Sequence, residues 1–258
     1  MPTTLGSAEF PLDAYAQRIG YSGNLAATTN VLDALHSAHA YEIPFENLDV
    51  VAGRGVRLDL QSLVDKIIVR RRGGYCYEVN GLFAHALERM GVPVQGLAAR
   101  NLMRPFEQRQ RTHLTLLATI GARQFLCDLG FGIYSPILPI PFEVGIAHEQ
   151  FGYRYRIDHH EFGHRLAIQL GDEWQDLYSF SLEPCPRVDF EIMNYFNSTH
   201  PSSPFVQTTL VARPRGHLRF GLRDRTLTTR FGIDLKSREI SDAAETERVL
   251  SEVFGLSV

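Results

Sequence analysis

Apolar residues in the first third of the chain recur with the three- and four-residue spacing of amphipathic helices. This spacing predicts short helices over residues 11–19, 28–40 and 62–70. The strongest pattern covers residues 75–90, and Gly91 with a nearby proline then provides a stop signal. The buried face of this helix is formed by Val79, Leu82, Phe83, Ala86, Leu87 and Met90. We therefore expect it to be a core helix.

The middle of the chain changes to the apolar–polar alternation that is typical of β-strands. Residues 113–120 and 124–129 are two such runs. The Gly121-Ala122 pair between them predicts a hairpin in which Ile120 faces Arg123. Further strands are predicted over residues 152–157, 165–170, 174–177, 208–212, 217–222 and 225–231.

Two later segments return to helical spacing. Residues 187–197 predict a short helix, and residues 243–254 predict a closing helix with Ser241 as its N-cap. The order is helices, then a mostly antiparallel β-barrel or sheet, then a small α/β region. This order indicates the α+β class.

The composition narrows the function classes. With 44% hydrophobic and 21% charged residues among 258, it is that of a soluble globular protein. A formal net charge of −3 leaves no basic excess for a general nucleic-acid or anionic-membrane surface. No apolar run approaches the roughly 18 residues of a membrane span, and residues 1–13 show no secretory signal. The three cysteines lack a Cys-x-x-Cys spacing, so a cytoplasmic protein with free thiols is expected.

Cys76 follows two glycines, Gly73 and Gly74, at the predicted start of the core helix. The glycines allow a tight turn, and the first N–H groups of a helix have no intrahelical acceptor. The positive end of the helix dipole favours a thiolate here, and the free N–H groups can stabilise an oxyanion. At this point two interpretations are open, a catalytic nucleophile or a small buried cysteine.

A cysteine nucleophile requires a base, and the base requires a group that orients it. In the predicted hairpin His113 pairs with Gly130, which puts Asp128 one diagonal step from His113 on the same face. Asp128 also interrupts an apolar run, where a carboxylate needs a partner. Each residue alone has an ordinary structural explanation. Together with Cys76 they form a Cys-His-Asp constellation like that of cysteine proteases.

The stretch from His160 to His164 matches the His-Glu-x-x-His pattern of zinc metalloproteases. That pattern binds zinc when both histidines lie on one face of a helix. Here it lies between two predicted strands and contains a helix-weakening glycine, so a hairpin loop is predicted. No third ligand is evident nearby, and no metal is expected.

Four stretches of the chain carry specific motifs in a fixed order. They are Ile43-Pro44-Phe45-Glu46-Asn47-Leu48, Arg72-Gly73-Gly74-Tyr75-Cys76-Tyr77-Glu78-Val79-Asn80, Thr112-His113-Leu114 and Asp128-Leu129-Gly130-Phe131-Gly132. Together they closely resemble the arylamine N-acetyltransferases. The resemblance implies a helical domain over residues 1–91 with the nucleophile, an antiparallel β-barrel domain over 92–198 with the histidine and the aspartate, and an α/β lid over 199–258.

The resemblance also implies roles for the candidate catalytic residues. The family's nucleophile falls on Cys76, its base on His113 and its orienting acid on Asp128. Asn80, one helical turn beyond the cysteine, matches a position that supports the aspartate.

Other matches concern the surroundings of the site. Arg72 and Glu46 match a structural ion pair of the family, although by residue type alone they could be solvated surface charges. Gly130-Phe131-Gly132 resembles the stretch beside which coenzyme A and the acceptor ring lie, with Phe131 as a substrate contact. Phe205 resembles an aromatic wall of the acceptor pocket.

The activity that the resemblance implies is acetyl transfer from acetyl-coenzyme A, through an acetyl-cysteine, to an arylamine, arylhydrazine or N-hydroxyarylamine. Acetyl-coenzyme A is the expected co-substrate, and no nucleic acid, membrane or obligate protein partner is expected. Alternatives that share the triad are an amide synthase that releases a carrier-bound acyl chain, a thiol hydrolase and a transglutaminase-like enzyme. A non-catalytic binding protein would not need all three residues.

Overall fold

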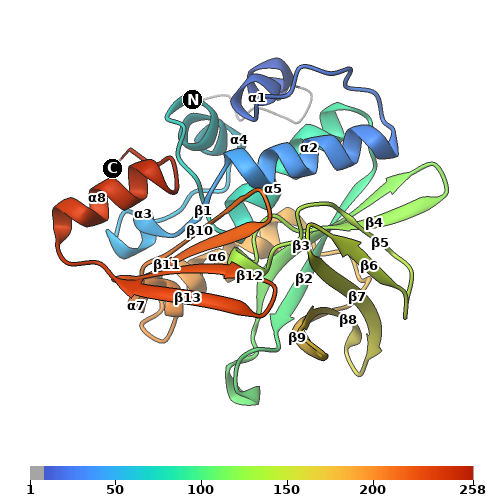
Figure 1. Ribbon diagram of the computed structural model, residues 1–258. Coiled ribbons are helices and arrows are strands. Elements are labelled where there is room, and N and C mark those ends of the chain that lie inside the picture. Colours follow the sequence, from blue (N-terminus) through green and yellow to red (C-terminus); the bar gives the residue numbers. More distant parts are fainter. Residues whose placement is uncertain (1–8, 258) are drawn as a thin grey trace.

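The computed structural model describes residues 9–257 of the chain. The first eight residues, part of the stretch without a secretory signal, lie outside this range. Helices dominate the first part of the chain and antiparallel strands most of the rest (Figure 1). The α+β class is therefore confirmed. Within the described residues, no helix has the length and apolar character that crossing a membrane requires.

The first part of the chain forms helices where the apolar spacing predicts them. The side chain of Thr28 caps the second helix by accepting a hydrogen bond from the Val31 N–H. The helix predicted over residues 62–70 begins at Leu60, directly after its N-cap Asp59, and continues from Val64 with π-helical geometry. The elements are α1 (Leu12–Arg18), α2 (Thr29–Glu42), α3 (Leu48–Val51), α4 (Leu60–Leu63), the π-helical segment (Val64–Val69) and α5 (Cys76–Arg89).

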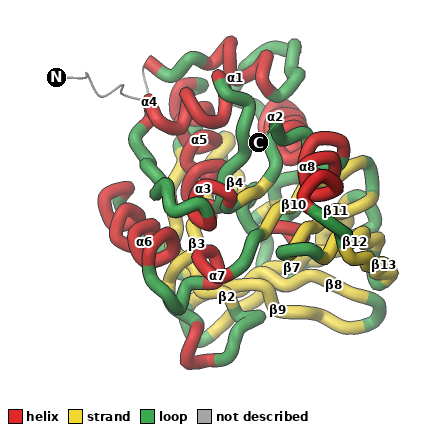
Figure 2. Tube along the Cα trace, turned by 90° about the vertical axis from the view of Figure 1, so that its left-hand side faces the viewer, coloured by secondary structure: helices red, strands yellow, loops and turns green. Residues whose placement is uncertain are grey.

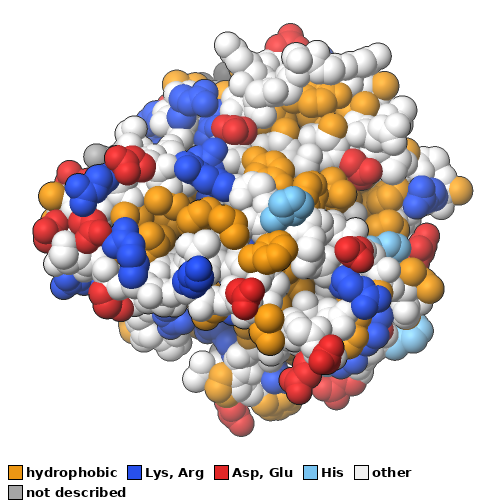
Figure 3. Space-filling model, in the orientation of Figure 1, with side chains coloured by type: hydrophobic (Ala, Val, Ile, Leu, Met, Phe, Trp, Pro, Cys, Tyr) orange, Lys and Arg blue, Asp and Glu red, His pale blue; other side chains and the backbone are white. Residues whose placement is uncertain are grey.

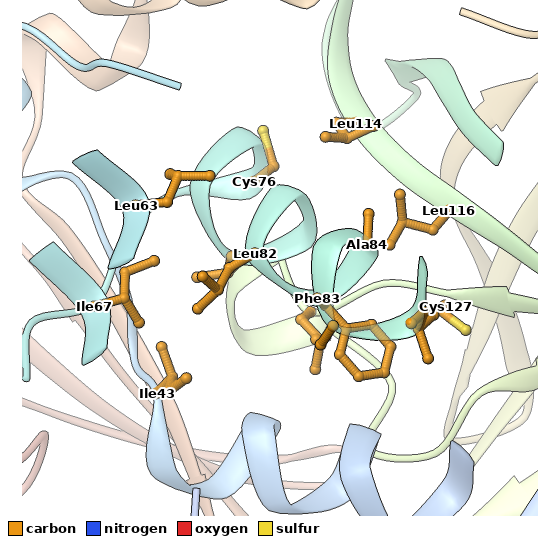
Figure 4. Close-up of a cluster of buried hydrophobic side chains, with 14 of the residues drawn as sticks. Ile43, Leu63, Ile67, Cys76, Leu82, Phe83, Ala84, Leu114, Leu116 and Cys127 are labelled. Carbon is orange, nitrogen blue, oxygen red and sulfur yellow. The ribbon is translucent and has the colours of Figure 1, made fainter. Parts of the chain in front are cut away.

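Helix α5 is the centre of the largest hydrophobic core. It packs between α4 with the π-helical segment on one side and strand β3 (Arg111–Ile120) on the other. Figure 4 shows Leu82 and Phe83 inside this cluster, where both are fully buried. Burial of each such side chain contributes about 1.5–3 kcal/mol. The packing places the first residue of α5 beside the first half of β3 (Figure 4).

Eight antiparallel strands form a sheet that curves into a nearly closed barrel (Figure 1). A second hydrophobic core, which includes Tyr155 and Phe180, fills its interior. The side chain of Gln150 bonds the backbone of Ile137 and Leu138 and so links the last strand to the segment before the first. The order is β5 (Ile140–Pro141), β4 (Arg123–Cys127), β3, β2 (Val94–Asn101), β9 (Glu173–Phe180), β8 (Gly163–Leu170), β7 (Tyr153–His160) and β6 (Ala147–Gln150).

Strand β3 is buried on both faces because it lies between the two cores. Leu116 belongs to the helical core and Leu117 to the barrel interior. The hairpin to β4 has the predicted register, since Ile120 pairs with Arg123. His113 lies an even number of residues from Leu117 and therefore on the barrel face.

Apolar alternation does not identify strand β2. Its sequence includes Gly96 and alanines, which are weak strand formers. It is a strand because β3 and β9 both pair with it. Packing explains the glycine at position 96, because a Cβ there would lie 3.0 Å from Phe190 of helix α6 (Arg187–Thr199).

The last part of the chain forms a second antiparallel sheet covered by α8 (Ala243–Glu252), with a third core between them. The predicted N-cap Ser241 is wrong, because Asp242 accepts the Glu245 N–H at 2.8 Å. Ser241 instead donates its N–H and hydroxyl to the Glu245 carboxylate. The sheet order is β1 (Phe45–Glu46), β10 (Leu210–Arg215), β11 (Leu218–Arg223), β12 (Thr226–Phe231) and β13 (Asp234–Glu239). The polar, exposed β13 has no apolar signal.

The division into domains at residues 1–91, 92–198 and 199–258 stays a prediction. Two elements cross these boundaries. Strand β1 pairs with β10 of the last segment, and α6 of the middle segment inserts Phe190 into the helical core. Figure 2 shows α6 beside β3, with α7 (Pro204–Gln207) between α3 and the barrel strands.

Charged side chains are mixed on the surface. On the face shown in Figure 3, Lys and Arg side chains alternate with Asp and Glu side chains, and hydrophobic side chains lie between them over the C-terminal sheet. This face therefore has no extended basic region, in keeping with the formal charge of −3.

Candidate functional site

Cys76 is the first residue of α5 and has 1% of its surface exposed. The turn before it is fastened to β1: the Gly74 N–H bonds the Pro44 carbonyl at 3.3 Å, and its carbonyl accepts the Glu46 N–H at 3.0 Å. Any Cβ at Gly73 would collide with the Pro44 carbonyl oxygen. The sulfur of Cys76 points away from the hydrophobic cluster (Figure 4).

His113 and Asp128 are in direct contact, with 2.7 Å between Nε2 and Oδ2. They are 6% and 0% exposed. The predicted pairing of His113 with Gly130 is wrong, because the β3–β4 ladder ends at Cys127 and His113 pairs with Ala99 on β2. The chain turns at Asp128, whose carboxylate accepts the Gly130 N–H at 2.8 Å. The contact is thus made by a turn beyond the strand.

The contact changes the pKa of both partners. Burial lowers the pKa of His113, but the charge of Asp128, with hydrogen bonds to Asp128 and Cys76, outweighs it and raises the pKa to about 10. Burial raises the pKa of Asp128, but His113, Asn80 and the Gly130 N–H together lower it. Near neutral pH the pair is therefore an imidazolium and a carboxylate. Since Nε2 binds the carboxylate, Nδ1 is the ring nitrogen left for the hydrogen bond to Cys76.

Asn80 connects the helix to the strands that carry the pair. Its Nδ2 donates to Asp128 Oδ1 at 3.0 Å and to the Leu114 carbonyl at 2.7 Å. Its Oδ1 accepts the Leu129 N–H at 2.8 Å. Asn80 is fully buried, so these bonds fix the start of α5 relative to β3 and to the turn after β4.

Gly130 lies directly against Cys76. A Cβ at Gly130 would be 2.5 Å from the Cα of Cys76 and 2.7 Å from its Cβ, closer than real side chains pack. Only glycine lets the turn approach the helix start this closely.

Arg72 and Glu46 form a buried ion pair beneath the turn. Arg72 donates Nη2 at 2.8 Å and Nε at 3.1 Å to Glu46 Oε1. The second oxygen of Glu46 accepts the Leu48 N–H at 2.7 Å. The pair joins β1 to the segment before Cys76. Removal of either partner would leave an uncompensated buried charge and so destabilise this connection.

A second buried ion pair was not predicted from the sequence. Lys66 Nζ lies 2.7 Å from Glu78 Oε1 and 2.9 Å from Asp49 Oδ2. The other oxygen of Glu78 accepts the Tyr75 N–H at 3.0 Å and so caps α5 just before Cys76. Burial raises the pKa of Glu78 to about 7, against the opposing charge of Lys66. The available signal was a lysine inside the apolar run of residues 64–69.

A cavity of about 600 Å³ opens beside Cys76 and His113. Gly130, Phe131, Gly132 and Phe205 all line it, together with residues of the β2–β3 loop and the C-terminal sheet. The Phe131 ring lies 5.0 Å from the His113 ring. Asp128 and Asn80 do not line the cavity and contact the site from behind.

Two aromatic residues of the site had no assigned role. Tyr178 lies just beyond the strand predicted over residues 174–177, and its ring is 4.9 Å from that of His113 and 5.0 Å from that of Phe131. Phe45 lines the cavity, and its ring lies 6.3 Å from that of Phe205. Phe45 belongs to the motif around Glu46, which was the available signal.

The His-Glu-x-x-His stretch is the hairpin between β7 and β8, as predicted. His160 pairs with Gly163, and His159 pairs with His164. The two histidines of the pattern therefore do not lie on a helix. Among residues 9–257, no group of three or more His, Cys, Asp or Glu side chains is arranged to hold a metal ion.

Comparison with known proteins gives a consistent result. Residues 28–258 match the family model described as N-acetyltransferase. The arylamine N-acetyltransferase of Mycolicibacterium smegmatis is 36% identical over 96% of this chain and 92% of its own length. That of Escherichia coli is 32% identical over 96% of this chain and 89% of its own.

Solved structures agree in fold. The Mycobacterium marinum arylamine N-acetyltransferase in complex with CoA superimposes with a TM-score of 0.91 and 37% identity, covering 95% of this chain and 92% of that one. The Nocardia farcinica enzyme gives 0.91 and 38%, covering 98% and 92%. The chain therefore belongs to the arylamine N-acetyltransferase family.

Proposed function

We propose that this protein transfers the acetyl group of acetyl-coenzyme A to an arylamine, arylhydrazine or N-hydroxyarylamine. The observation that carries the proposal is the buried Cys76–His113–Asp128 arrangement beside a cavity of about 600 Å³. The names of the relatives support it, including the Mycobacterium marinum protein, whose structure is a complex with CoA.

In the first step the Cys76 thiolate attacks the thioester carbon of acetyl-coenzyme A. The carbon–sulfur bond to coenzyme A breaks, and the departing thiolate takes the proton from the His113 imidazolium. Cys76 then carries the acetyl group, and His113 is neutral. N–H groups at the start of α5, which have no intrahelical acceptor, are proposed to stabilise the oxyanion.

In the second step the nitrogen of the acceptor attacks the acetyl-cysteine. His113 removes the N–H proton as the amide forms, and the Cys76 thiolate is released. The original imidazolium–thiolate pair is thereby restored. Asp128 holds the imidazole orientation and stabilises its cation, and Asn80 holds Asp128.

The cavity lining supports an aromatic acceptor whose amine is uncharged. Phe131 and Phe205 are proposed to contact its ring, and Gly130 and Gly132 to let coenzyme A approach the backbone. Aromatic amines are weakly basic and arrive unprotonated. A lysine ammonium would meet the His113 imidazolium and no carboxylate, since no described Asp or Glu lines the cavity.

Mass spectrometry of the intact protein with acetyl-coenzyme A alone tests the first step. We expect one added acetyl group, located on the peptide that contains Cys76. Cys185→Ala should still be acetylated, although Cys185 is the more exposed thiol. Cys76→Ala should not. No adduct on the wild type, or an equal adduct on Cys76→Ala, would contradict the proposal.

The isolated acetyl-protein tests the second step. We expect it to be discharged by arylamines far faster than by water or a lysine side-chain analogue. Faster discharge by water would favour a thiol hydrolase, and faster discharge by the lysine analogue a transglutaminase-like enzyme.

A further inference from the structure

Two arginines line the cavity from separate elements. Arg104 lies in the loop between β2 and β3, and Arg223 ends strand β11. Arg223 is exposed and Arg104 is half-buried, whereas Cys76 and His113 are almost fully buried. The arginines therefore lie at the open side of the cavity and the reacting pair at its closed side.

Neither guanidinium has a counter-ion within residues 9–257, where no ion pair or side-chain hydrogen bond joins Arg104 or Arg223 to a neighbour. Other arginines of the chain are paired, such as Arg72 with Glu46 and Arg165 with Asp176. Among the described lining residues there is no Asp or Glu. Apart from His113, the remaining polar lining is neutral and hydrogen-bonding, and it includes Asn101, Gln108, Gln110, Thr112 and Thr228.

The two cations influence each other. Burial, and after it the charge of Arg223, lowers the pKa of Arg104. Like charges held close together without a counter-ion raise the energy of the unliganded protein. An anion placed between them removes this repulsion and gains charge-assisted hydrogen bonds, which guanidinium groups form well with phosphate and carboxylate.

We propose that Arg104 and Arg223 form an anion-binding site that holds a phosphate or carboxylate group of the ligand whose reacting group lies at Cys76. The inference rests on the proposed function and specifies how the ligand is held. The phosphates of coenzyme A are the expected source, because a long arm can place its anion at the open side and its thioester at the closed side. A carboxylate on the acceptor is the other source of the same chemistry.

Steady-state kinetics with two donors test the site. In Arg104→Gln and Arg223→Gln we expect the KM for acetyl-coenzyme A to rise about tenfold for each arginine, as for loss of one charge-assisted contact. The KM for p-nitrophenyl acetate, a neutral donor without phosphate, should stay within about twofold. Arg248→Gln, which removes the same charge from an exposed position on α8 outside the cavity, is the matched control.

The acceptor arm uses p-nitrophenyl acetate as donor and compares aniline with 4-aminobenzoate. If the bound anion is the acceptor's, the variants raise the KM for 4-aminobenzoate alone. An unchanged KM for acetyl-coenzyme A and for 4-aminobenzoate in both variants would overturn the proposal.

Calorimetric titration with coenzyme A and with inorganic pyrophosphate separates the site from the catalytic function. The double variant Arg104→Gln/Arg223→Gln should bind both ligands more weakly than wild type, with an unchanged circular dichroism spectrum. Equal binding by wild type and double variant would refute the anion site. If Cys76 is never acetylated and binding still depends on the arginines, the proposed function fails and the site stands.

Discussion

At the scale of single residues, two buried histidines have opposite electrostatic environments. His113 contacts the Asp128 carboxylate, and its pKa rises to about 10 despite burial. His36 bonds the Ile137 carbonyl at 2.8 Å, and burial lowers its pKa to about 4. A carbonyl accepts, so Nδ1 of His36 carries the proton, and its buried Nε2 has no partner among the described residues. Burial keeps the His36 ring neutral, whereas the Asp128 carboxylate outweighs burial at His113.

His36 makes stability depend on pH. Its pKa is about 4 in the folded protein against an ordinary 6.5, so between these values the unfolded chain binds the proton more strongly. The contribution of His36 to the free energy of unfolding is therefore complete above pH 6.5 and is lost as the pH falls towards 4. Between pH 7.5 and pH 5 this one residue should account for about 2 kcal/mol of the loss.

The variant His36→Gln isolates this effect, because its amide still provides a donor for the Ile137 carbonyl. Urea unfolding at pH 7.5 and pH 5 should show a loss that is about 2 kcal/mol smaller in the variant than in the wild type. Identical losses would show that His36 is not a neutral, buried group in the folded protein.

At the scale of elements, two glycines in or beside helix α5 have different surroundings. Gly81 lies inside the helix, and a Cβ there would meet only Leu63 Cδ1 at an ordinary 3.6 Å. Gly130, in the turn after β4, lies against the Cys76 backbone with no space for a Cβ. Helix propensity disfavours glycine at position 81, and no tertiary contact requires it there. At position 130 the contact with Cys76 does require glycine.

The matched variants Gly81→Ala and Gly130→Ala should therefore behave in opposite ways. Gly81→Ala should raise the free energy of unfolding by about 0.5–1 kcal/mol with unchanged acetylation of Cys76. Gly130→Ala should slow that acetylation at least about tenfold, because the turn and the start of α5 must separate. Thermal unfolding and the rate of acetylation by p-nitrophenyl acetate measure both effects; a fully active Gly130→Ala would contradict the close contact.

At the scale of the whole molecule, the three cores are joined by segments distant in sequence. Asn47 donates to the carbonyls of Phe205 and Thr208, both at 2.8 Å, and accepts the Leu210 N–H at 2.7 Å. It is 2% exposed. These bonds tie the end of β1 to the start of the C-terminal sheet.

We expect the cores to unfold together. Trp174, the only tryptophan of the chain, lies on β9 of the barrel, so its fluorescence reports on the barrel while far-UV circular dichroism also reports on the helices. The two urea midpoints should coincide. Asn47→Ala should lower both by the same amount, a loss of about 1–3 kcal/mol, whereas the exposed Asn24→Ala should leave both unchanged. Separated midpoints would favour independent domains.

Elements with a strong local signal were predictable. The spacing of apolar residues located α5 to within a residue at each end, and the Gly121-Ala122 pair located the β3–β4 hairpin with its register. Strand β2 could not be found, because its pairing partners rather than its own residues make it a strand. Strand β13 has one apolar residue, the exposed Leu235, and within the described residues it pairs with β12 alone.

The candidate site divides in the same way. Cys76, His113 and Asp128 could be proposed from the sequence, because the order of the motifs and the alternation of side chains along a strand can both be read from it. Their contact was expected from a continued ladder, but a turn at Asp128 provides it. Lys66 and Glu78 are 12 residues apart and lie on different elements, and the arginines of the cavity lie in the β2–β3 loop and on β11, so no helical or strand spacing could join them.

The sequence by itself determined the core helix, the position of the thiol at its start and the family, because spacing, glycine placement and motifs are local properties. Only the tertiary structure decided which groups are charged and paired: the imidazolium of His113, the neutral ring of His36, and the cations Arg104 and Arg223, which have no counter-ion among the described residues. The physical reason is that charge in a folded protein depends on burial and on the nearest partner, and both are set by residues distant in the chain.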